Sequence, residues 1–127
     1  MSAKSNPAGW FEVYVDDLAR ARAFYEAVLQ RPLAELPTPD PQMQLLAFEM
    51  NQEGYGASGA LVKHPMMKPG LGGTVVYFSC LDCAQEAERA VAHGGQICIP
   101  KKSIAPYGFI AWIIDTEGNT VGLHSMQ

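Results

Sequence analysis

The chain is short of positive charge, and this excludes two classes of partner. Nine lysines and arginines stand against 13 aspartates and glutamates, which gives a net charge of −4 at pH 7 and a pI of about 5.2. Nucleic acid and acidic membrane surfaces are bound through basic patches, which an acidic chain does not supply. We therefore expect neither nucleic acid nor a membrane among its partners.

Long apolar runs and cysteines are also scarce. No stretch approaches the ~18 uninterrupted apolar residues of a membrane-spanning helix, and residues 1–9 lack the apolar core of a signal peptide. The chain has three cysteines, an odd number that does not build a disulfide framework and indicates reduced thiols. These features predict a cytoplasmic protein.

An internal repeat is the most informative pattern that is present. Residues 47–54, AFEMNQEG, align with residues 111–118, AWIIDTEG, at an offset of 64. Residues 15–18, VDDL, align with residues 80–83, CLDC, at an offset of 65. A unit of this length is too long for a solenoid repeat, but it fits two supersecondary modules that fuse their sheets around one pocket.

Each copy predicts the element order β-α-β-β-β. Period-two alternation indicates strands, and apolar residues at helical spacing indicate a helix that begins after Asp16 or Asp17 as N-cap and ends before Pro32. In the second copy Gly94 ends the helix. The expected strands cover residues 10–15, 33–36, 44–50, 56–62, 74–80, 96–99, 109–114 and 120–125, and the second helix covers 83–93.

At 127 residues and 48% hydrophobic content, the chain supports a single domain, 1–127. The first module is expected at about 9–62 and the second at about 73–125. Residues 63–72 form the linker between them, because two prolines and a glycine there end regular structure.

Two motifs in the correct order resemble the vicinal oxygen chelate superfamily, which contains glyoxalase I, bleomycin-resistance proteins and extradiol dioxygenases. They are VDDL at 15–18 followed by AFYEAVL at 23–29, and DTEGN at 115–119 leading to Gly122 and Leu123. The resemblance covers nearly the whole chain. It implies an α+β fold in which two βαβββ modules form a curved, cup-shaped mixed sheet with both helices outside, and a homodimer that covers exposed sheet edges.

The resemblance also marks the positions of a metal site. In metal-dependent members the ligands lie on the first and last strands of each module, and the matching positions here hold Trp10, Ser58, Val75 and Gly122. An indole, a valine methyl group and a hydrogen donate no lone pair to a metal. We expect no metal and no other cofactor at this site, while an atypically placed divalent metal stays open.

Candidate chemistry lies one step along the same strands. Glu12, Tyr77 and His124 each stand two residues beyond a metal position and therefore share its face. A carboxylate and an imidazole that face one cavity can carry out acid–base catalysis, so these three are the candidate catalytic residues. In the alternative interpretation, Glu12 and His124 only satisfy each other or nearby backbone groups.

Aromatic side chains supply a candidate binding surface. Trp10 and Tyr14 share the face of Glu12 and suit stacking on a planar or apolar ligand. Ser58 adds a hydroxyl group, and Tyr107 lies in a loop that is expected to close over the cup. Large aromatic side chains also fill such cups structurally, so that alternative stays open. The opposite face of the first strands is assigned to the helix-side core: Phe11, Val13, Val76 and Phe78.

The cysteines are assigned structural roles. Cys80 and Cys83 have the spacing of a redox motif at a helix start, but Cys80 falls on the helix side of its strand and no second pair is present for zinc. Cys98 is expected to behave as a small hydrophobic residue in a short apolar strand.

Three functions from different classes follow. The first is a metal-free protein that binds a small organic molecule in the cup, as the antibiotic-sequestering branch of the superfamily does. The second is a lyase or isomerase that acts on a small carbonyl or epoxide substrate through Glu12 and His124. The third is an interaction module without a ligand site.

Overall fold

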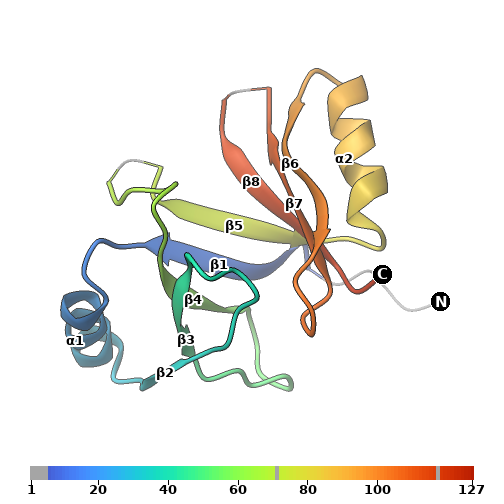
Figure 1. Cartoon of the computed structure of the whole chain (residues 1–127). Coiled ribbons are helices and arrows are strands. Elements are labelled where there is room, and N and C mark those ends of the chain that lie inside the picture. Colours follow the sequence, from blue (N-terminus) through green and yellow to red (C-terminus); the bar gives the residue numbers. More distant parts are fainter. Residues whose placement is uncertain (1–5, 71, 117) are drawn as a thin grey trace. The chain divides into compact units, whose positions relative to one another are not determined.

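The computed structural model describes residues 6–70, 72–116 and 118–127, so Glu117 of the repeat lies outside the described residues. The chain divides into two compact units (Figure 1). The N-terminal unit is Trp10–Thr74, and the C-terminal unit combines residues 6–9 with Val75–Gln127.

The N-terminal unit is a four-stranded mixed sheet with one helix. Its strands lie in the order β2-β3-β4-β1, where β1 and β4 are parallel and the other pairs are antiparallel. The elements are β1 (Ala8–Tyr14), α1 (Leu18–Leu29), β2 (Leu33–Glu35), β3 (Gln44–Phe48) and β4 (Ser58–Lys63).

The C-terminal unit repeats this connectivity. Its strands lie in the order β6-β7-β8-β5, with β5 and β8 parallel and the remaining pairs antiparallel. The elements are β5 (Thr74–Ser79), α2 (Cys83–Ala92), β6 (Gln96–Ser103), β7 (Phe109–Ile114) and β8 (Thr120–Ser125). The predicted α+β class and the two βαβββ modules are therefore confirmed.

Each helix begins at an aspartate at the predicted strand-to-helix turn. The Asp17 carboxylate accepts the N–H of Arg20, and the Asp82 carboxylate accepts the N–H of Ala84. Both groups satisfy main-chain donors that the first helical turn leaves unpaired. Neither helix, within the described residues, is long and apolar enough to span a bilayer.

Each helix packs on one face of its own sheet. In the N-terminal unit Leu18, Ala21 and Tyr25 of α1 contact a buried cluster, whose members are Leu33, Leu46, Phe48 and Leu61. In the C-terminal unit Cys83 and Ala87 of α2 are buried with Ala111 and Leu123. These helix-side cores explain the apolar stripes at helical spacing in both copies.

Side chains of α1 also cover the outer edge of β2. Arg22 Nη2 donates to the carbonyl of Leu33 at 2.7 Å, and the Leu33 N–H donates to Glu26 Oε2 at 2.8 Å. Arg22 and Glu26 are themselves paired at 3.1 Å. Because both main-chain groups of Leu33 have partners, the edge strand ends the sheet without an open hydrogen-bonding site there.

Two sequence predictions about the C-terminal unit are wrong. Strand β6 continues through Pro100 to Ser103 instead of ending at Ile99, because its register with β7 shifts between Ile99 and Lys102, which accommodates the proline. Val76 and Phe78 are each 37% exposed, because α2 packs on β6, β7 and β8 and leaves the helix-side face of β5 uncovered.

Asp82 gives the fold a pH dependence. Its carboxylate accepts hydrogen bonds from Lys101 Nζ at 2.9 Å and from the Ala84 N–H at 3.1 Å, and these bonds hold the pKa of Asp82 below its usual 3.8. Since the pKa is lower in the folded chain, this stabilisation is present above the pKa of the unfolded chain. It is lost as the pH falls through the pKa of the folded chain.

We predict that Asp82→Asn, which keeps a capping side chain but loses the charge opposite Lys101, lowers Tm at pH 7. The difference in Tm from the natural chain should shrink as the pH falls below the usual carboxyl pKa of 3.8 and through the lowered pKa of Asp82, where the natural carboxylate takes up its proton. Thermal unfolding followed by circular dichroism measures both curves, with Asp16→Asn as the control at an exposed aspartate. A difference that stays constant across this pH range would contradict the prediction.

Candidate functional site

The face of β1 that points away from α1 carries Trp10, Glu12 and Tyr14. Phe11 and Val13 occupy the other face and pack against the α1-side cluster. Tyr14 is 2% exposed and Glu12 is 6% exposed. A carboxylate buried to this degree needs hydrogen-bond donors close to it.

Neighbours on its own strand hold the Glu12 carboxylate. The Tyr14 hydroxyl donates to Oε1 at 2.7 Å, and Trp10 Nε1 donates to Oε2 at 3.4 Å. These donors spread the negative charge of the group and fix its orientation. The strand therefore presents an oriented carboxylate between two aromatic side chains, which can accept a hydrogen bond or a proton from a bound molecule.

Ser58 lies beside this group, on the parallel neighbour β4. Its Cα pairs with that of Trp10, and its Oγ donates to the carbonyl of Phe48 at 3.2 Å. The hydroxyl proton is therefore used within the unit, and its oxygen lone pairs are what Ser58 offers a ligand.

In the C-terminal unit Tyr77 and Trp112 form a buried pair on the face away from α2. Trp112 Nε1 donates to the Tyr77 hydroxyl at 2.7 Å, and both side chains are less than a tenth exposed. Gly122 on β8 is the register partner of both residues. A Cβ at position 122 would overlap the Tyr77 ring, so the absence of a side chain there makes room for the phenol.

His124 follows on the same face of β8 and is tied to a loop. Its Nε2 lies 2.6 Å from the carbonyl of Tyr107. Because a carbonyl only accepts, Nε2 carries the proton of the neutral ring and Nδ1 keeps a lone pair that can act as a base. Tyr107 belongs to a turn closed by its own N–H on the carbonyl of Ile104, and its role as a lid stays a prediction.

Glu12 and His124 belong to different units. The structure gives each of them hydrogen-bond partners within its own unit. That the two residues face one cavity stays a prediction.

The four positions that the resemblance marks as a metal site do not suit a divalent metal in this chain. Ser58 supplies a single neutral hydroxyl, Trp10 and Val75 supply no lone pair for a metal, and the Tyr77 ring occupies the space that a side chain at 122 would need. The parallel pairs also differ in register, since Trp10 pairs with Ser58 whereas Gly122 pairs with Tyr77 and not with Val75. Elsewhere in the described part of the chain, no three His, Cys, Asp or Glu side chains converge as a metal site.

The cysteines do not form a reactive site. Burial and the nearby Glu86 carboxylate raise the pKa of Cys80 to about 11, which keeps the thiol protonated and unreactive at neutral pH. Cys83 is buried and its N–H donates to Ser125 Oγ at 3.0 Å. Cys98 is exposed, because it lies on β6 outside the α2-side core, so its expected hydrophobic role is wrong.

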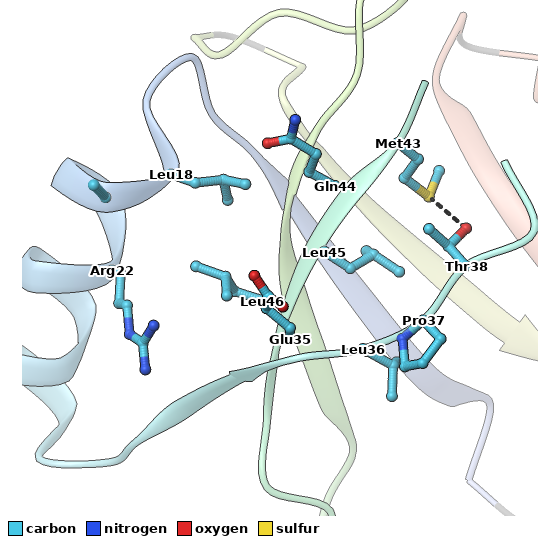
Figure 2. Close-up of a pocket in the computed structure, with 11 residues that line it drawn as sticks. Leu18, Arg22, Glu35, Leu36, Pro37, Thr38, Met43, Gln44, Leu45 and Leu46 are labelled. Carbon is cyan, nitrogen blue, oxygen red and sulfur yellow. Dashed lines mark hydrogen bonds between the residues drawn. The ribbon is translucent and has the colours of Figure 1, made fainter. Parts of the chain in front are cut away.

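A pocket of about 630 Å³ lies in the N-terminal unit, between the start of α1 and the β2–β3 connection (Figure 2). No predicted site residue lines it. Its wall is Leu18, Ala19, Arg22, Glu35, Leu36, Pro37, Thr38, Met43, Gln44, Leu45 and Leu46. The sequence signal that could have indicated it is the proline-rich segment 37–41, which carries the chain away from the sheet edge after a strand of only three residues.

Several solved structures resemble this one. No protein-family model and no curated protein matches the sequence. Methylmalonyl-CoA epimerase from Mycobacterium tuberculosis superposes with a TM-score of 0.70 and 16% identity, over 100% of this chain and 93% of that one. A variant of the Streptomyces coelicolor epimerase in complex with 2-nitronate-propionyl-CoA gives 0.66 and 14%, over 94% and 93%. A hypothetical protein from Bacillus halodurans C-125 gives 0.69 and 13%, over 98% and 96%.

Sequence identities this low support a shared fold and not a shared function. The superpositions extend over nearly the whole chain. The methylmalonyl-CoA epimerases belong to the vicinal oxygen chelate superfamily. This chain therefore has the vicinal oxygen chelate fold that its two sequence motifs predicted.

Proposed function

We propose that this chain is a small-molecule-binding protein of the glyoxalase and bleomycin-resistance type that works without a metal at the usual positions. The observation that carries the proposal is the Glu12 carboxylate, nearly buried and held by Tyr14 and Trp10. It lies two residues from the first metal position, which holds Trp10. On these strands the chain therefore has a polar group that can hold a ligand, the Glu12 carboxylate, but no set of metal donors at the usual positions. We call this carboxylate the anchor.

The chemistry of the anchor restricts the ligand. An ionised carboxylate only accepts hydrogen bonds, so the ligand must offer an N–H or O–H group or a positive charge. Aromatic side chains at Trp10 and Tyr14 favour a planar ligand or one with apolar area. We therefore propose a planar organic molecule with a donor or cationic group.

A metal-free binding assay tests this proposal. We predict that protein treated with chelator is still stabilised by planar cations in a thermal-shift panel, since a ligand at 100 times its Kd adds about 2.7 kcal/mol. Glu12→Gln keeps the size of the side chain but removes its charge, and should weaken binding at least about tenfold, or ~1.4 kcal/mol. Glu49→Gln, at an exposed glutamate just after β3, is the matched control. Binding that is lost with chelator, or is unchanged in Glu12→Gln, would contradict the proposal.

An isomerase is the second candidate, because methylmalonyl-CoA epimerases share the fold. In such a reaction one base removes the proton from the carbon beside a thioester carbonyl, and a conjugate acid returns a proton to the opposite face. Glu12 and His124 are the proposed pair. The lone pair expected on His124 Nδ1 and the oriented Glu12 carboxylate support these roles.

Proton exchange separates the two candidates. If the chain is an isomerase, methylmalonyl-CoA in D₂O should exchange its C2 hydrogen in the presence of chelator. Glu12→Gln and His124→Ala should each slow that exchange by about 10² or more, the usual contribution of a general acid or base. Mass spectrometry measures the deuterium. Exchange no faster than in buffer would refute the epimerisation of methylmalonyl-CoA and favour the binding protein. If thermal-shift panels also show no ligand, the interaction module remains.

We also propose a homodimer. Val76 and Phe78 are exposed on the helix-side face of β5. Leu81, two residues after the end of this strand, is 80% exposed. Adjacent apolar side chains of this kind are typical of surfaces that a second chain covers. We predict about twice the 13.8 kDa chain mass in light scattering at micromolar concentration, with a shift toward the single-chain mass in Phe78→Ser but not in Tyr55→Ser. A natural chain that runs as a monomer would refute the dimer.

A further inference from the structure

The pocket between α1 and the β2–β3 connection combines an apolar wall with charged groups. Leu18, Leu36 and Leu46 line it together with Arg22 and Glu35 (Figure 2). Its volume, about 630 Å³, suits a small molecule. All its residues belong to the N-terminal unit, and none takes part in the proposed Glu12 site.

The Arg22 guanidinium is held in a fixed orientation at the edge of this pocket. Nη2 donates to the carbonyl of Leu33 at 2.7 Å and Nε donates to Glu26 at 3.1 Å. A guanidinium has five N–H donors in one plane, so further donors remain for a planar acceptor such as a carboxylate. The side chain is 46% exposed, which leaves it accessible from solvent.

Glu35 provides the opposite charge. It lies two residues beyond Leu33 on β2, on the same face, and lines the same pocket as Arg22. Within the described ranges, no hydrogen bond or ion pair engages the side chain of Glu35 or that of Gln44. The wall of the pocket therefore carries a cationic donor and an anionic acceptor next to leucine side chains.

We propose that this pocket binds a free apolar α-amino acid. The carboxylate of the ligand pairs with Arg22, its ammonium group pairs with Glu35, and its side chain contacts Leu18, Leu36 and Leu46. An α-amino acid carries both charges, so one ligand offers a partner to each of these two groups. A simple acid can pair only with Arg22, and a simple amine only with Glu35. A ligand that carries both charges should therefore bind more tightly than either.

L-leucine titrated into ¹⁵N-labelled full-length protein tests the proposal. We expect saturable amide shifts at Gln44, Leu45 and Leu46, and at least about tenfold weaker binding of leucinamide and of 4-methylpentanoate, each of which lacks one charge. Equal affinity for the three compounds, or no shifts at 50 mM leucine, would overturn it.

Two matched variant pairs locate the charges. Glu35→Gln should weaken leucine at least about tenfold and leave 4-methylpentanoate unchanged, whereas Glu49→Gln should change neither. Arg22→Lys keeps the charge but loses the planar fork, and should weaken leucine where Arg31→Lys does not. Unchanged leucine affinity in Glu35→Gln would refute the proposal even if leucine binds.

Discussion

Parallel pairing between the first and last strands of each module is the constraint on which the other features depend. In a strand, alternate side chains point to opposite faces. Each helix packs on one face of its own sheet, and the apolar core lies there. Phe11 and Val13 on β1, and Leu123 on β8, are placed in this way. Glu12, between Phe11 and Val13, and His124, next to Leu123, therefore each point to the face of their own sheet that the helix does not cover.

Local signals explain why so much of the fold could be predicted from the sequence. Asp17 and Asp82 mark helix starts because a short acceptor side chain is the chemistry that the first helical turn needs. The predictions are wrong where contacts between elements determine whether a side chain is buried. Alternation along β5 predicts that Phe78 is a core residue, but α2 packs on the other strands and leaves it exposed. The sequence of a strand does not show how far a helix extends over the sheet.

The candidate site was predictable in part for the same reason. Glu12 interrupts a strand of aromatic and β-branched residues, so alternation alone assigns its face, with Trp10 and Tyr14 beside it. Trp112 lies in FIAWII, a run without polar residues, where alternation cannot assign a face. Its hydrogen bond to Tyr77 joins residues 35 positions apart in sequence, and only the strand register brings them together.

The phenol that lies over Gly122 also constrains how this protein could acquire a metal centre in the course of descent. A glutamate or histidine at 122 would collide with Tyr77 before it could coordinate anything, so that substitution is harmful as long as the tyrosine remains. A smaller residue at position 77 would make room for such a side chain, and it would also remove the hydrogen bond that Trp112 Nε1 donates to the phenol. A metal ligand at position 122 therefore requires a change at position 77 as well, so the two positions are coupled in descent.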